Sequence, residues 1–251
     1  MPREIRPGLR LARFDQSVLD DAPGIVGVDE VGRGAWAGPV TAAAVRVERH
    51  AYASPGFRKA VALANDSKTL PLPRREALFT TLEALATDGL IAFAVGWSSC
   101  MEIDRHNILG ATTLAMRRAV ELLPNCPLEP ADSLPLFQNG HKRTCYRLHV
   151  DGLPVRALPW RHKAYTKGDS KSLAIALASI VAKVTRDRHM TRLDRAHPGY
   201  DFAQNNAYPT EAHQQGLRQL GPCPEHRAKF LRKFNAREGP LPAQTALGLA
   251  E

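Results

Sequence analysis

The chain has 251 residues, of which 44% are hydrophobic and 24% charged, so a wholly disordered, collagen-like or disulfide-scaffold protein is excluded. It carries 34 lysines and arginines against 25 aspartates and glutamates, a net charge of +9. A positive excess of this size favours a polyanionic partner, nucleic acid first.

The beginning of the chain and its cysteines indicate the compartment. Charges run through the first twenty residues, which therefore lack the apolar core of a secretory signal. No apolar stretch reaches the roughly 18 residues that a membrane helix needs. The cysteines form no CxxC pair and fit no zinc spacing; they are Cys100, Cys126, Cys145 and Cys223. We expect a cytoplasmic protein with reduced thiols and no membrane contact.

Strands and helices alternate along the first half of the chain. Residues 25–29 form an apolar run that ends in an acid, and residues 39–47 read as a second strand in a hairpin-like pair. Leucines at helical spacing predict a helix over 73–87, and alternation predicts a strand over 91–97. An apolar repeat at three- and four-residue steps predicts a helix over about 105–123.

Prolines interrupt the pattern over 124–145, which we interpret as a surface loop. The later elements are expected as strands over 146–151 and 154–158, helices over 170–188 and 210–220, and a loose tail over 238–251. Ser170 is the expected N-cap of the helix that follows it. No linker separates these elements, so the sequence predicts one α/β domain with a mixed sheet.

Four carboxylates fall at positions where a core does not favour them. Asp29 ends the first strand and Glu30 follows it, Asp151 ends a later strand, and Asp169 precedes a helix. Ligand sites of α/β sheets form at the carboxyl ends of strands. Clustered carboxylates repel unless cations neutralise them, and Mg²⁺ and Mn²⁺ prefer such oxygen ligands. Two such ions suit phosphodiester hydrolysis, which points to a nuclease.

One geometric condition applies to this cluster, because adjacent strand residues point to opposite faces. Asp29 and Glu30 can share a site only if the chain turns there, and Gly32 and Gly34 permit a turn. Taken singly, each acid also fits a solvated or capping role.

A glycine loop and a basic segment accompany the acids. Gly32, Arg33 and Gly34 either let backbone approach a sugar or phosphate, or form a plain turn. Residues 141–200 hold 13 lysines and arginines and only 4 acids, which indicates either a phosphate-tracking face or a solvated one. The contributors expected there are Lys167, Lys171, Lys183 and Arg186. Tyr208, in a polar stretch, either stacks on a sugar or base or packs structurally.

Seven segments, in order, resemble the ribonuclease HII family. They are GVDEVGRGAWAGPV (27–40), NDSKTL (65–70), EIDRHNILGATTLAMRRAV (102–120), VDG (150–152), KGDSKSLAIALASIVAKVTRD (167–187), AYPTEAH (207–213) and HRAKF (226–230). The resemblance covers about residues 22–234. It implies a single catalytic domain, with 1–21 and 238–251 peripheral, and an RNase H-like fold: a mixed five-stranded sheet flanked by helices, with a C-terminal helical extension.

The resemblance also implies roles for individual residues. The family's four acids fall on Asp29, Glu30, Asp151 and Asp169. The backbone of Gly32, Arg33 and Gly34 would read the 2′-OH at an RNA–DNA junction, which is the group that distinguishes RNA from DNA. Tyr208 would stack on the neighbouring deoxyribose, and Lys68 would lie near the substrate backbone. Ala35-Trp36, Asp201 and the long 124–145 loop depart from the usual pattern, which bears on kinetics and substrate preference rather than on the reaction.

We therefore expect a monomeric endonuclease that hydrolyses the RNA strand of RNA/DNA hybrids. It would also cut 5′ to single ribonucleotides embedded in DNA, using two Mn²⁺ or Mg²⁺ ions bridged by Asp29, and leave a 3′-OH and a 5′-phosphate. Two other classes use the same features. A metal-dependent phosphohydrolase of small phosphates would share the acids, and a non-catalytic duplex-binding module would use the basic segment alone.

Overall fold

The structure is a computed structural model, and it describes residues 6–64, 70–132, 145–239 and 241–242. The chain forms two compact units. The sheet unit comprises residues 1–31, 41–97 and 113–184, and the C-terminal unit comprises residues 32–40, 98–112 and 185–251. Whether the two act as the single catalytic domain expected from the sequence stays a prediction.

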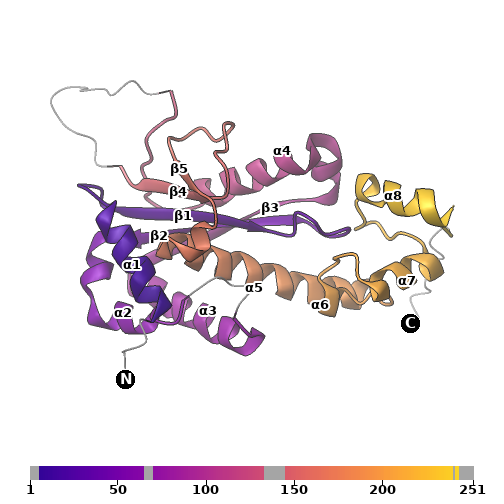
Figure 1. Cartoon of the computed structure of the whole chain (residues 1–251), viewed down its shortest axis with the longest axis horizontal. Coiled ribbons are helices and arrows are strands. Elements are labelled where there is room, and N and C mark those ends of the chain that lie inside the picture. The colour runs from indigo at the N-terminus through magenta and orange to yellow at the C-terminus, as the bar shows by residue number, and fades with distance from the viewer. Residues whose placement is uncertain (1–5, 65–69, 133–144, 240, 243–251) are drawn as a thin grey trace. The chain divides into compact units, whose positions relative to one another are not determined.

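A five-stranded mixed sheet forms the centre of the sheet unit, in the order β3-β2-β1-β4-β5 (Figure 1). The strands are β1 (Gly24–Val31), β2 (Val40–Glu48), β3 (Ile91–Ser98), β4 (Arg147–Asp151) and β5 (Lys163–Tyr165). β1 and β2 pair antiparallel, whereas β4 is parallel to both β1 and β5. The predicted hairpin, the strand over 91–97 and the mixed five-stranded sheet are confirmed.

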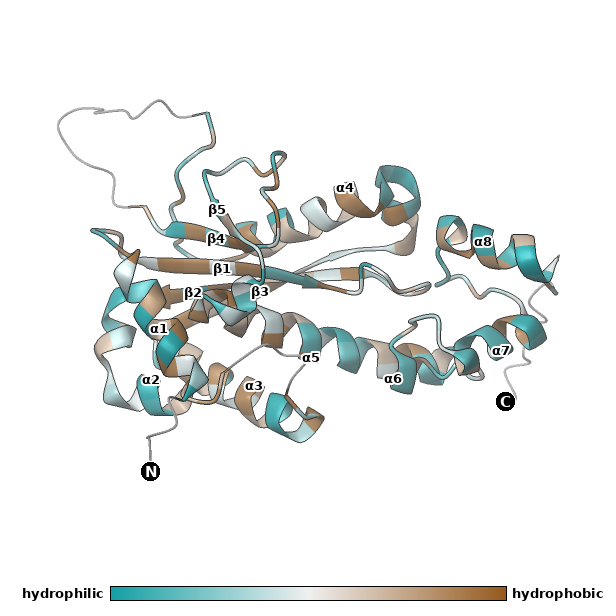
Figure 2. Ribbon diagram, viewed as in Figure 1, coloured by the Kyte–Doolittle hydropathy of each residue, from teal (hydrophilic) through white to brown (hydrophobic). Residues whose placement is uncertain are grey.

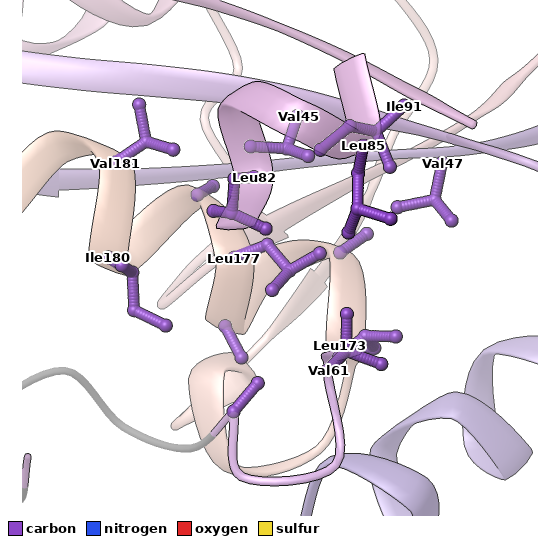
Figure 3. Packing of buried hydrophobic residues seen from close by; sticks show 14 of the residues in the cluster. Val45, Val47, Val61, Leu82, Leu85, Ile91, Leu173, Leu177, Ile180 and Val181 are labelled. Carbon is purple, nitrogen blue, oxygen red and sulfur yellow. The ribbon is translucent and has the colours of Figure 1, made fainter. Parts of the chain in front are cut away.

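Helices cover one face of this sheet with an apolar layer. Three helices lie on the same side of the sheet as the first turns of α5 (Leu173–Ala196) (Figure 1). They are α1 (Pro7–Ser17), α2 (Pro55–Ala60) and α3 (Leu72–Thr87), and the 3-10 turn η1 (Arg49–Ala53) precedes α2. Figure 3 shows Leu82 and Leu85 of α3 among side chains of β2 and α5, with Val45 and Leu177 nearby. Burial of each of these side chains stabilises the folded state by about 1.5–3 kcal/mol. The helix expected over 73–87 is α3.

The helix expected over 105–123 begins earlier and is interrupted. α4 spans Cys100–Glu121, and Asn107 inside it has non-helical angles, φ 58° and ψ 173°. The Asn107 side chain accepts hydrogen bonds from the N–H groups of Leu109 and Gly110, at 2.9 and 3.1 Å, and so caps the second part. The apolar repeat therefore predicted the second part and missed the first.

The helix expected over 170–188 starts three residues later and is longer, because α5 spans Leu173–Ala196. Ser170 is not its N-cap, since it lies in a 3-10 turn, η2 (Gly168–Ser170). Ser172 takes that place, with its hydroxyl 3.5 Å from the N–H of Ile175.

The strand predicted over 154–158 is wrong. The N–H of Leu158 donates to the carbonyl of Val155 at 3.0 Å, and the N–H of Val155 donates to the His162 ring at 3.1 Å. These local bonds leave the segment in turns. The fifth strand forms later, where Ala164 of β5 pairs with Val150 of β4.

The C-terminal unit adds three helices: α6 (Phe202–Asn205), α7 (Glu211–Leu220) and α8 (Ala228–Glu238). Thr210 caps α7 by accepting from the N–H of His213 at 3.3 Å, so the helix predicted over 210–220 is confirmed. α7 and α8 are largely hydrophilic along their length (Figure 2). Their apolar residues pack with Tyr200 and Phe202 into a small core of this unit. Within the described ranges, no helix is long and apolar enough to cross a membrane.

Candidate active site

Strand register brings the first pair of acids together in the sheet unit. Val28 of β1 pairs with Val150 of β4, so Asp29 and Asp151 are the next residues along two neighbouring parallel strands. Paired positions of a sheet share a face. Both carboxylates therefore leave the same face of the sheet, Asp151 at the end of β4 and Asp29 two residues before the end of β1. In Figure 2, β1 is brown over most of its length and turns teal toward this end.

Glu30 does not meet the geometric condition set by the sequence. β1 continues through Val31, and Glu30 is still paired with Ala42 of β2. The turn comes two residues later, at Gly32, where φ is 86°. By strand alternation Glu30 leaves the face opposite to that of Asp29.

The buried carboxyl of Asp29 is strongly perturbed. Burial, followed by the negative charges of Glu30 and Asp151, raises its pKa well above the ordinary value. Hydrogen bonds from the Ser179 side chain and from the Glu30 N–H act in the opposite direction, the latter at 2.7 Å. Repelling carboxylates in a buried position are what a cation would neutralise.

Asp169 is held beside Asp151 through the residue before it. The N–H of Gly168 donates to Oδ1 of Asp151 at 2.5 Å, and η2 contacts β4. A side chain at Gly168 would begin 3.1 Å from the same oxygen, so the backbone approaches closely there. Lys167 adopts the left-handed conformation, with φ 55°, which turns the chain into η2. Asp169 itself is buried.

These residues fit a divalent metal in their chemistry, because the donor set consists of carboxylate oxygens, two of which add to the raised pKa of Asp29. Over the ranges that the structure describes, no three His, Cys, Asp or Glu side chains are close enough together to hold an ion as they stand. Asp29 and Asp151 lie beside each other on paired strands, and Asp169 follows the residue whose N–H contacts Asp151.

The glycine loop and the tyrosine lie together in the C-terminal unit. Arg33 and Gly34 are exposed, and Tyr208 is 37% exposed. A Cβ at Gly34 would lie 3.6 Å from the Tyr208 ring. The N–H of Trp36 donates to the carbonyl of Ala207 at 2.7 Å, which ties the loop to the tyrosine segment. The structure thus brings together the residues that the resemblance assigned to the junction.

Arg227 holds the glycine loop from inside the unit, a role that sequence reasoning missed. Its side chain is fully buried and donates to several backbone carbonyls. The acceptors are Arg33 at 3.1 Å, Ala35 at 2.8 Å and Gly38 at 2.9 and 2.8 Å. The signal available in the sequence was the matching segment HRAKF, which contains this arginine.

Arg186 contradicts the expectation that it contacts phosphate, because it too is fully buried. It donates to the carbonyls of Ala37, Pro39 and Asn206 at 3.4, 3.2 and 3.0 Å. A Cβ at Gly32 would lie 2.2 Å from its Nε, so only glycine fits there. Burial lowers the pKa of the guanidinium. Arg186 therefore joins the glycine loop to the tyrosine segment.

A chain of hydrogen bonds through two histidines ends at Tyr208. The N–H of Cys223 donates to Nδ1 of His226, Nε2 of His226 lies 3.0 Å from Nε2 of His213, and Nδ1 of His213 lies 3.0 Å from the carbonyl of Tyr208. This pattern fits two neutral rings, each donating toward Tyr208. Burial lowers the pKa of both, that of His226 to about 3.

The remaining site candidates lie at the surface or outside the described residues. Lys167 and Lys171 are exposed on either side of Asp169, Lys183 is half-buried, and Lys68 lies outside the described residues. His149 is buried and packs against Tyr165, with the two ring centroids 4.9 Å apart. Burial lowers the pKa of His149 to about 4. All four cysteines are free thiols, as predicted.

Comparison with known proteins identifies the relatives of this chain. The family model "Ribonuclease HII" matches residues 26–235. A ribonuclease HII of Granulibacter bethesdensis is 44% identical over 223 residues, covering 88% of this chain and 90% of that protein. The ribonuclease H2 structure of Pyrococcus horikoshii matches with a TM-score of 0.62 and 23% identity, over 86% of this chain and 98% of that one. The structure of Bst ribonuclease HIII in complex with Mn²⁺ matches with a TM-score of 0.53 and 21% identity, over 82% and 65%. At these identities the two structures establish the fold.

Proposed function

The chain belongs to the ribonuclease HII family, an endoribonuclease family that cleaves the RNA strand of RNA/DNA hybrids, and we propose how its residues perform that reaction. Membership decides against a small-phosphate hydrolase and against a non-catalytic duplex-binding module. The observation that carries the assignment of residues is the register that sets Asp29 beside Asp151, with Asp169 fixed next to them through Gly168.

We propose that Asp29, Glu30, Asp151 and Asp169 hold two divalent ions, Mn²⁺ or Mg²⁺. Such ions would supply a nucleophilic water and stabilise the charge that develops on the leaving oxygen. The Mn²⁺ complex of the distant ribonuclease HIII supports Mn²⁺ as the first probe. Glu30, whose charge already acts on Asp29, would complete the set. In the reaction water adds to phosphorus and the bond to the 3′ oxygen breaks, leaving a 3′-OH and a 5′-phosphate.

We propose that the C-terminal unit recognises the substrate. The backbone of Gly32, Arg33 and Gly34 would read the 2′-OH of a ribonucleotide, and Tyr208 beside it would stack on the next sugar. Exposed Lys167 and Lys171, with Lys183, would contact phosphates near the acids, as Lys68 would from a segment outside the described residues. A single ribonucleotide in duplex DNA would then be cut on its 5′ side.

The test is cleavage of three duplexes in Mn²⁺: DNA with one ribonucleotide, a long RNA/DNA hybrid, and DNA alone. We expect one cut 5′ to the ribonucleotide, cutting of the hybrid, and no cut in DNA. Asp29→Asn should abolish both activities and leave duplex binding intact, because the charge that it removes is needed for the metals. Glu83→Gln, an exposed acid of α3, is the matched control and should cut like the unmodified chain. An active Asp29→Asn variant would refute the assignment.

A second pair of variants tests the recognition residues. Tyr208→Ala should lower cleavage of the single-ribonucleotide duplex far more than cleavage of the hybrid, because a long hybrid offers many registers. Equal losses on both substrates would show that Tyr208 has no role at the junction.

A further inference from the structure

α1 contacts the segment that carries Asp169 on both sides of that residue. The guanidinium of Arg10 donates to the carbonyl of Ser170 at 3.0 Å. The ring of Phe14 meets the ring of Tyr165 edge-on, with centroids 5.4 Å apart. One contact thus lies four residues before Asp169 and the other directly after it.

The third contact comes from Asp15, a carboxylate that is fully buried. Its Oδ2 accepts from the N–H of Ala174 at 2.9 Å and from the hydroxyl of Tyr52 at 3.1 Å. Ser172 and the N–H of Leu173 also act to lower the pKa of this carboxyl, which burial raises. The first N–H groups of a helix have no partner within the helix. Asp15 therefore caps α5 from another helix and fixes where α5 begins.

The three contacts together hold residues 165–174 in place. The same segment places the Gly168 N–H on Asp151, so its position affects two of the four acids. α1 lies wholly before residue 26, where the match to the family model starts. Nothing in the proposed reaction uses Arg10 or Asp15, yet both bear on the backbone next to Asp169.

We propose that α1 is a positioning element for the metal ligand Asp169, and that Arg10 and Asp15 act through the backbone of residues 165–174. This inference rests on the proposed metal site. Residues that orient metal ligands without touching the ion typically change metal affinity or activity 10–100-fold when they are replaced. α1 should therefore influence metal affinity without influencing duplex affinity.

The experiment measures Mn²⁺ binding to the full chain without nucleic acid, from the electron paramagnetic resonance signal of free Mn²⁺. Arg10→Ala and Asp15→Ala should each raise the dissociation constant for Mn²⁺ about 10-fold. Arg13→Ala is the matched control, an exposed arginine of the same helix, and should bind like the unmodified chain. Binding of an RNA/DNA hybrid in Ca²⁺ should be the same for all four proteins.

The outcomes separate positioning from stability and from the metal site itself. Asp15 is buried, so its loss also lowers the melting temperature; Arg10 is exposed, so Arg10→Ala keeps the fold. Unchanged Mn²⁺ affinity in Arg10→Ala and in folded Asp15→Ala would overturn the positioning role alone. Unchanged affinity in Asp169→Asn would overturn the proposed metal site, and the inference with it.

Discussion

Replacing Arg227 with methionine tests how the glycine loop is held. Arg227 satisfies the carbonyls of Arg33, Ala35 and Gly38. An unsatisfied buried carbonyl costs about 1–3 kcal/mol, so losing the partner of the buried Ala35 and Gly38 carbonyls costs roughly 4 kcal/mol, and the part-buried Arg33 carbonyl adds less. Burial, with the like charge of Arg186, lowers the pKa of Arg227 to about 10, so the buried cation itself costs free energy that methionine avoids and that offsets part of this loss. The net loss should be about 3 kcal/mol.

The assay is equilibrium unfolding in urea, which reports the free energy of unfolding. Arg232→Met is the matched control, because Arg232 is an exposed arginine of α8 and its loss changes the net charge equally. It should shift the free energy of unfolding by less than about 0.5 kcal/mol. If Arg227→Met is no more destabilising than this control, the carbonyl contacts do not hold the loop.

The same variant should also alter selectivity. On the proposed role of the loop, a loosened loop would read the 2′-OH less well, so cleavage of the single-ribonucleotide duplex should fall by a larger factor than cleavage of the long hybrid. The ratio of the two rates, measured in Mn²⁺ under conditions where the variant is folded, checks this. An unchanged ratio would refute the link between Arg227 and recognition.

The remaining predictions concern stability. The pKa of His226 is lowered to about 3 in the folded protein, so its neutral ring stabilises the fold above the unfolded pKa of about 6.5, and this stabilisation is lost as the pH falls. Between pH 7.5 and 5 the free energy of unfolding should fall by about 2 kcal/mol, and His226→Gln should remove that part of the pH dependence measured in urea. Gly27→Ala would set a Cβ 2.1 Å from the backbone of Ala174 and should cost at least about 3 kcal/mol; chemical unfolding with an unshifted midpoint would contradict this close contact. Leu177→Ala should cost about 2–5 kcal/mol, with a thermal-melt loss under 1 kcal/mol as the contrary result.

Local patterns predicted the elements that carry a strong repeat. Apolar alternation found β3, and leucine spacing found α3. The prediction of a strand over 154–158 was wrong because a run of five apolar and basic residues fits a strand and a series of turns equally well. The pattern cannot show that Val155 bonds to the His162 ring. The start of α5 was misplaced because its cap includes Asp15, which lies far away in the sequence.

The candidate site likewise has parts that local sequence patterns predicted and parts that they did not. Strand ends predicted that Asp29 and Asp151 lie together, because strand direction and alternation are local properties. The turn needed for Glu30 was misplaced by two residues, since glycine permits a turn without requiring one. The roles of Arg186 and Arg227 depend on contacts between distant segments, and a basic residue in a basic stretch carries no sign that it is buried.

The hydrogen bond from Arg227 to the carbonyl of Arg33 also determines which way the peptide group between Arg33 and Gly34 faces. In a trans peptide the carbonyl of one residue and the amide hydrogen of the next point in opposite directions. The carbonyl of Arg33 faces the buried guanidinium, so the amide hydrogen of Gly34 is directed away from it, on an exposed residue. The buried guanidinium of Arg227 therefore leaves an N–H donor, that of Gly34, rather than a carbonyl acceptor on the outer side of the loop. A ribose oxygen meeting that hydrogen must offer a lone pair, so a 2′-substituent without one would not be recognised there.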